Sequence, residues 1–226
     1  MINNSEASHN DADMKFSELA PFATLLDMKD RYTREHAWRV AIYARRLAVR
    51  IGLNGIDREN IWLGGLLHDI GKIGLSIKVL NNTHNQLSDA MLAEVQQHPL
   101  IGEAVLKGFD IAPAVIDFVR YHHEKMDGSG YPFGLQKDQI PIGARIIRVA
   151  DCFDAITTDR PYQQRKSWIK AVAILRQISG TDLDPELVDA FIVDIKEKGL
   201  VFDPFRSLSQ SARFLTAERS RFVGRC

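Results

Sequence analysis

The chain has 226 residues, which is enough for one domain with a substantial hydrophobic core. Lys and Arg together number 29, as do Asp and Glu, so no net charge favours binding to a nucleic-acid polymer or an anionic membrane. Two cysteines are too few for a disulfide framework, no apolar run approaches the roughly 20 residues of a membrane span, and the N-terminus lacks a signal-peptide pattern. A cytoplasmic location is therefore expected.

Polarity divides the chain into three segments. Residues 1–15 are rich in Asn, Asp and Ser, and we expect them to form a disordered lead because they have little apolar surface to bury. Residues 16–198 carry the helical patterns of a single domain. Residues 199–226 have a mixed pattern and are predicted to form a tail that is helical in part.

Apolar residues recur at helical spacing through most of the chain, and no segment alternates as a β-strand does. Helices are predicted over 17–29, 33–52, 57–71, 88–98, 99–108, 113–123, from 141, over 167–179 and over 185–198. Thr33 and Asp57 are the expected N-caps of the second and third helices, and Pro99 should break or kink the helix that reaches His98. Residues 72–87 are expected to be mostly loop, and the predicted fold class is all-α.

Histidine and aspartate side chains gather at the ends and inward faces of these helices. His68 and Asp69 stand side by side after an apolar run, where a buried carboxylate is costly unless its charge is paired or bound to a metal. An imidazole nitrogen beside an anionic oxygen suits a first-row transition metal. The candidate metal ligands, which include five of the seven histidines, are His36, His68, Asp69, His98, His122, His123 and Asp151.

Each candidate ligand also has a structural explanation. His36 taken alone is more often a core histidine than a ligand. His122 and His123 could interact with the negative end of their helix, and Asp151 could cap a neighbouring element. All of these explanations would have to hold together for the whole set, and we therefore favour a metal centre.

Several separated motifs surround the candidate ligands. They are HDIGKIG at 68–74, HHEKMDGSGYP at 122–132, VADCFDA at 149–155 and RPY at 160–162. In order and spacing they resemble the HD-GYP subfamily of the HD superfamily, whose members are metal-dependent cyclic di-GMP phosphodiesterases. The resemblance covers about residues 20–195.

This resemblance implies a single HD-type helical bundle around a dinuclear metal centre. A metal-bridging hydroxide would hydrolyse cyclic di-GMP to the linear pGpG, with further hydrolysis to GMP left open. Asp69 would bridge the two ions, for which the resemblance favours iron or manganese and leaves nickel or zinc as alternatives. By position, one ion would take His36, His68, Asp69 and Asp151, and the other Asp69, His98, His122 and His123.

The resemblance also implies groups that act on the substrate. Lys72 would place a positive charge on a phosphate oxygen, and Arg160 would offer a bidentate fork. Gly130 would let the backbone approach the ligand, and Tyr131 would present a ring to a guanine or ribose. Asp154, one helical turn after the last ligand, would orient a ligand, assist the leaving group or only cap a neighbour. Catalysis is therefore assigned to Asp69, Lys72 and Asp154.

Several positions depart from the family pattern. Tyr32 stands where some members carry a Glu that is associated with a third metal, so a centre of two metals is expected. Ser76 and Ile77 replace a usual Pro and Asp, and Gln163 replaces a basic residue. These changes leave open 3',3'-cyclic GMP-AMP as the substrate, or a catalytically weak cyclic-dinucleotide sensor. A homodimer or a signalling-protein partner also stays open.

Overall fold

The structure is a computed structural model, and the part that it describes is helical. The described residues are 31–80, 82, 87–159 and 164–201. Within them there are two isolated β-bridges and no strand, so the all-α prediction is confirmed. The expected helix over 17–29 lies outside the described residues, as do the N-terminal lead and most of the C-terminal tail, and the domain boundaries stay predictions.

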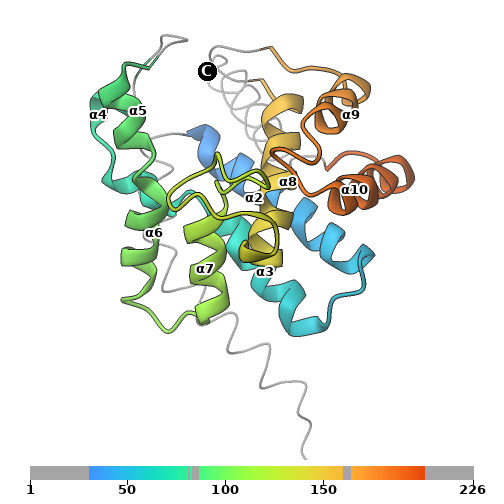
Figure 1. Cartoon of the computed structure of the whole chain (residues 1–226), viewed down its shortest axis with the longest axis horizontal. Coiled ribbons are helices and arrows are strands. Elements are labelled where there is room, and N and C mark those ends of the chain that lie inside the picture. Colours follow the sequence, from blue (N-terminus) through green and yellow to red (C-terminus); the bar gives the residue numbers. More distant parts are fainter. Residues whose placement is uncertain (1–30, 81, 83–86, 160–163, 202–226) are drawn as a thin grey trace, which may run out of the picture.

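The described helices form one bundle. In chain order they are α2 (Arg31–Arg50), α3 (Gly55–Leu67), the 3₁₀ turn η1 (Ile70–Gly74), α4 (Ile77–Leu80), α5 (Asp89–Val95), α6 (His98–Leu106), α7 (Pro113–Tyr121), the 3₁₀ turn η2 (Lys137–Gln139), α8 (Ile142–Thr157), α9 (Trp168–Gln177) and α10 (Pro185–Lys198). Helices α2, α3 and α8 pack against one another at the centre (Figure 1). Helices α6 and α7 flank them on one side, and α9 and α10 on the other (Figure 1). None of the described helices is long and apolar enough to cross a bilayer.

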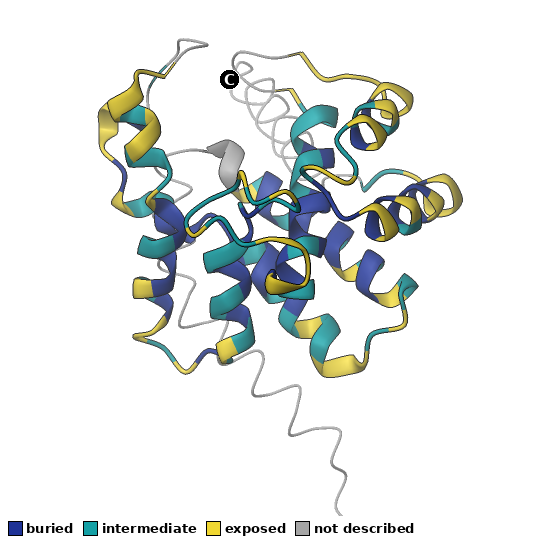
Figure 2. Ribbon diagram, viewed as in Figure 1, coloured by how far each residue is buried: buried dark blue, intermediate teal, exposed yellow. Residues whose placement is uncertain are grey.

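Two apolar clusters hold the bundle together. In the larger one, Tyr43, Phe153 and Phe191 are buried and meet edge to face, with ring centroids 5.1 to 5.7 Å apart. The smaller one joins the end of α3 to α6 and α7, and its centre includes Leu106 and Val119. The inner faces of the central helices are correspondingly buried (Figure 2). The two clusters hold the central helices and the α6–α7 pair in fixed relative positions.

Two predicted N-caps are wrong. Helix α2 already runs through Thr33 from Arg31, because the weak helix propensity of a single Thr does not stop a helix whose later turns are buried. The cap of α3 is Asn54, whose side chain accepts the N–H of Asp57 at 2.9 Å. Asp57 lies instead in the first turn, where its charge faces the positive end of the helix.

The helix boundaries beside the candidate ligands also differ from the prediction. Helix α3 ends at Leu67, short of Gly71, so His68 and Asp69 form the turn that leads into η1. Helix α5 ends at Val95, and the break falls before His98, because Pro99 is tolerated in the first turn of α6. Within the predicted loop, residues 77–80 form the short helix α4.

Other boundaries are confirmed. Ser88 and Ser167 cap α5 and α9 through their side chains, and α7 begins at Pro113. Helix α10 has the predicted limits, and its N-cap is Asp184. The starts of α5, α9 and α10 agree with the prediction because a capping side chain sets each of them, and Pro113 fits the first turn of α7.

Candidate metal centre

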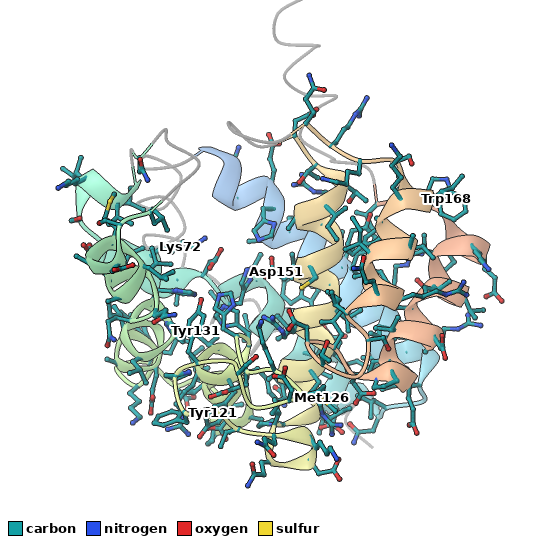
Figure 3. The ribbon with its side chains drawn as sticks, turned by 45° about the horizontal axis from the view of Figure 1, so that its top comes forward. Lys72, Tyr121, Met126, Tyr131, Asp151 and Trp168 are labelled. Carbon is teal, nitrogen blue, oxygen red and sulfur yellow. The ribbon has the colours of Figure 1, made fainter. Side chains whose placement is uncertain are left out.

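The structure brings all the predicted ligands together from separate elements. They are His36 in α2, His68 and Asp69 after α3, His98 at the start of α6, His122 and His123 at the end of α7, and Asp151 in α8. Lys72, Tyr131 and Asp151 border the same central region (Figure 3). Most of these ligands are buried, while His123 and Asp151 are half-buried.

One group of ligand atoms lies between α2, α3 and α8. Atoms of His36, His68 and Asp69 all lie within 4.8 Å of one another. His36 Nε2 is 3.2 Å from Asp151 Oδ1 and 3.9 Å from Asp69 Oδ2. His68 Nε2 is 3.3 Å from the same Oδ2 of Asp69. Two imidazole nitrogens and two carboxylates therefore converge here.

A second group lies on the other side of Asp69. Ligand atoms of Asp69, His98, His122 and His123 also lie within 4.8 Å of one another. His98 Nε2 is 3.5 Å from Asp69 Oδ1 and 3.2 Å from His122 Nε2. Asp69 thus faces the first group with Oδ2 and the second with Oδ1, which is the arrangement of a bridging carboxylate.

The ring nitrogens are oriented for metal binding. In His68, His98 and His122, Nδ1 lies 2.7 Å from the carbonyl oxygen three residues earlier, so Nδ1–H donates and Nε2 keeps its lone pair. The lone pairs of His98 and His122 face each other, an arrangement that a cation between them would stabilise. Within the part of the chain that the structure describes, the buried Nε2 of His68 has no hydrogen-bond partner. The donor set therefore fits divalent metal ions.

Burial and charge favour the ligating protonation states. Burial lowers the pKa of His98, His122 and His123, which keeps these rings neutral at pH 7. Burial alone would raise the pKa of Asp69 and Asp151. Neighbouring cationic groups, Lys72 beside Asp69 and the His36 ring beside Asp151, nevertheless hold both pKa values well below the usual range.

His36 has the opposite shift. Burial alone would lower its pKa, but hydrogen bonds to Asp151 and Asp154 raise the pKa to about 9. In the metal-free protein both nitrogens of the His36 ring are therefore protonated at neutral pH, and the ring is positively charged. An ion that binds at Nε2 must displace the proton on that nitrogen.

Asp154 lies behind His36. It is fully buried, with Oδ2 2.7 Å from His36 Nδ1, and its Oδ1 accepts a hydrogen bond of 2.6 Å from Arg39 Nε. Three roles were left open for Asp154, and its contact with His36 supports the role of orienting a metal ligand. Arg39 was not predicted as a functional residue, although its place three residues after His36 on the same helical face was a usable signal.

The predicted substrate-binding residues have mixed outcomes. Lys72 Nζ is 2.7 Å from Asp69 Oδ2, and its side chain is 33% exposed. Tyr131 stacks on His123 with centroids 4.7 Å apart and planes 23° apart. A Cβ on Gly130 would lie 2.4 Å from Lys125 N, so this glycine is required where the loop folds against its own backbone. Arg160 lies outside the described residues.

Comparison with known proteins identifies the family. The model of the HD domain family matches residues 21–187. The chain belongs to the HD-domain family. HD domains bind divalent metals, and the two His/Asp groups could hold such ions.

Curated relatives of this HD-domain chain agree with the motifs. It is 36% identical over 193 residues to 3'3'-cGAMP-specific phosphodiesterase 3 of Vibrio cholerae, covering 84% of this chain and 41% of the relative. It is 38% identical over 169 residues to a cyclic di-GMP phosphodiesterase of Pseudomonas aeruginosa, covering 74% and 40%. The resemblance to HD-GYP phosphodiesterases is confirmed, and the chain spans about two fifths of the length of these relatives.

A solved structure supports the fold. The crystal structure of a cyclic GMP-AMP-specific phosphodiesterase of Vibrio cholerae matches with a TM-score of 0.63 at 19% identity. The match covers 78% of this chain and 47% of the other. An HD-type helical bundle is therefore confirmed.

Proposed function

We propose that this HD domain is a phosphodiesterase that opens cyclic di-GMP to the linear pGpG. The observation that carries the proposal is Asp69, whose two oxygens face two separate groups of ligand atoms. When bound, two divalent ions would activate water for attack on phosphorus and neutralise charge on the phosphodiester. Further hydrolysis of pGpG to GMP is a second step that the same centre could perform.

The side chains of this chain would hold the ions as two neighbouring sets. Oxygen and neutral imidazole nitrogen ligands suit iron or manganese, with nickel and zinc as the alternatives. One set would be His36, His68, Asp69 and Asp151, and the other Asp69, His98, His122 and His123. Asp154 would orient the His36 ring and maintain its position as a ligand.

Other side chains would bind the substrate. The Lys72 ammonium pairs with Asp69, and once Asp69 binds metal the flexible lysine can turn to a phosphate oxygen. Tyr131, held by stacking on His123, would support a guanine or ribose. Arg160 and the backbone at Gly130 are further candidate contacts. General acid help from Asp154 has less support, because its oxygens are engaged by His36 and Arg39.

The test combines metal content with turnover. Protein purified anaerobically and reconstituted with iron or manganese should hold two ions per chain and form linear product. Asp69→Asn should lose both ions and abolish turnover, because this residue serves both sets. Asp189→Asn, on the exposed side of α10, is the matched control and should behave as wild type. Absence of bound metal in the wild type would refute the proposal.

A second candidate substrate is 3',3'-cyclic GMP-AMP. It is favoured by the 36% identity to a relative whose name gives that specificity, against 38% to a cyclic di-GMP phosphodiesterase. Initial rates on both dinucleotides decide between them. Metal-loaded protein that binds a dinucleotide without turnover would be a sensor instead. The cytoplasmic location and a homodimer or signalling partner stay predictions.

A further inference from the structure

The turn between α9 and α10 contacts the loop that carries Tyr131. We define the glycine-rich loop as residues 124–136, which connect α7 to η2 and run across the front of the bundle in Figure 1. We propose that Asp182 is a positioning residue for this loop and thereby for the binding of the cyclic dinucleotide. The expected effect on KM rests on the proposed function, whereas the expected effect on the mobility of the loop does not depend on it.

Asp182 connects the loop to α8 with a single carboxylate. Its Oδ1 is 2.9 Å from Lys125 Nζ in the glycine-rich loop, and its Oδ2 is 3.2 Å from Arg148 Nη2. The Asp182 side chain is 24% exposed and that of Arg148 only 11%, so water screens these pairs incompletely. Next to them, the N–H of Asp127 donates to the Thr181 carbonyl at 2.9 Å. The loop is therefore held at two points by the same turn.

The turn that carries Asp182 is itself fixed. The Asp182 N–H donates to the Ile178 carbonyl at 2.9 Å, and the Gly180 N–H donates to the Leu183 carbonyl at 2.8 Å. Asp184 caps α10 and lies 2.7 Å from Arg145 Nη1, which attaches the turn to α8 a second time. Asp182 therefore attaches the glycine-rich loop to a turn that is itself hydrogen-bonded and anchored to α8.

The same loop holds Tyr131. Glu124 is buried and accepts the N–H groups of Phe133 and Leu135 at 2.7 and 2.9 Å, which closes the loop around its centre. The Tyr131 N–H donates to the His123 carbonyl at 3.3 Å, and its ring lies on the His123 ring. Loss of the Lys125 contact would remove one of the two points at which the turn holds this closed unit, and the position of Tyr131 would then depend more on its contacts with His123.

This arrangement predicts an effect on binding that a purely stabilising ion pair would not have. Asp182→Asn removes the charge and keeps the shape of the side chain. We expect faster amide hydrogen exchange in the glycine-rich loop, at the Asp127 amide above all, with unchanged exchange in α10. The KM for the cyclic dinucleotide should rise about fivefold, with kcat within about twofold and the metal content unchanged.

The experiment uses the full chain loaded with metal. Lys125→Met removes the loop side of the same contact and should reproduce both changes, which keeps the test valid if Asp182→Asn fails to fold. Asp189→Asn, on the exposed face of α10, is the matched control and should change neither exchange nor KM. Wild-type exchange in the loop of Asp182→Asn, or a fall in kcat with loss of metal at constant KM, would overturn the inference. If the wild type hydrolyses neither dinucleotide, the proposed function fails, and loop exchange alone decides the role of Asp182.

Discussion

At the scale of single residues, buried contacts behind the candidate ligands help to fix the positions of those ligands. Asp154 holds His36 at Nδ1 and is held in turn by Arg39, so the position of one ligand depends on a buried ion pair. The same carboxylate helps to raise the pKa of His36 to about 9. Asp154 therefore affects both the orientation of the His36 ring and, together with Asp151, the pKa of that ring.

Asp154→Asn should weaken metal binding and change its proton balance. Adding manganese to chelator-treated wild type at pH 7.5 should release about one proton, because His36 is charged below pH 9 and an ion at Nε2 must displace that proton. Release should decline as the pH rises through about 9, where the free ring already loses its proton. In Asp154→Asn the affinity for manganese should fall about 10- to 100-fold, and fewer protons should be released on binding than in the wild type. A pH indicator in weakly buffered solution and a metal titration measure both quantities.

Asp189→Asn provides the control for this experiment, since it removes an exposed carboxylate far along the chain from His36. It should bind metal and release protons as the wild type does. Equal affinity and equal proton release in Asp154→Asn and wild type would show that Asp154 does not support His36.

At the scale of elements, the close crossing of η1 and α6 brings the two ligand groups together. A Cβ on Gly71 would lie 1.8 Å from the His98 carbonyl oxygen and 2.5 Å from the Gly102 nitrogen. Only glycine permits this approach, which places Asp69 and His98 on facing segments. The glycine that follows the His-Asp doublet is thus a packing requirement of the centre.

Gly71→Ala should separate η1 from α6 and disrupt the centre. The clash is with backbone atoms, so we expect a loss of about 1–3 kcal/mol in unfolding free energy. His98 would also move away from Asp69, and the metal content should fall to about one ion per chain. Gly55→Ala is the matched control, because a Cβ there meets nothing within 4 Å. Thermal unfolding and metal analysis of both variants test this, and retention of two ions in Gly71→Ala would contradict it.

At the scale of the whole molecule, the candidate metal centre lies between the two sides of the bundle. Its candidate ligands come from α2 and α8, which belong to the larger apolar cluster, and from elements beside the smaller one. Ions bound at the centre would therefore hold together parts of the molecule that apolar packing joins less directly. Their binding free energy contributes to the stability of the folded chain.

Removal of metal should lower the melting temperature. Ligand at 100 to 1,000 times its Kd stabilises by about 2.7–4.1 kcal/mol, and a domain of this size shifts by about 2–4 °C per kcal/mol. A chelator should therefore lower Tm by about 5–15 °C, and added manganese should restore it. His122→Ala should show a smaller shift, because it lacks one of the buried ligands. An unchanged Tm after complete metal removal would contradict a centre that spans the bundle.

The helical class, several helix starts and the set of gathered histidines and aspartates follow from the amino-acid sequence alone. These features are encoded locally, in apolar periodicity, in capping side chains such as Ser88 and Ser167, and in short motifs. Which atoms face each other depends on the packing of the helices in three dimensions. Arg39 meets Asp154 across 115 positions and Arg148 meets Asp182 across 34, and such pairs depend on how the helices pack. Helix packing also determines which ligand group each oxygen of Asp69 faces. This depends on the crossing of η1 and α6, which neither segment encodes alone.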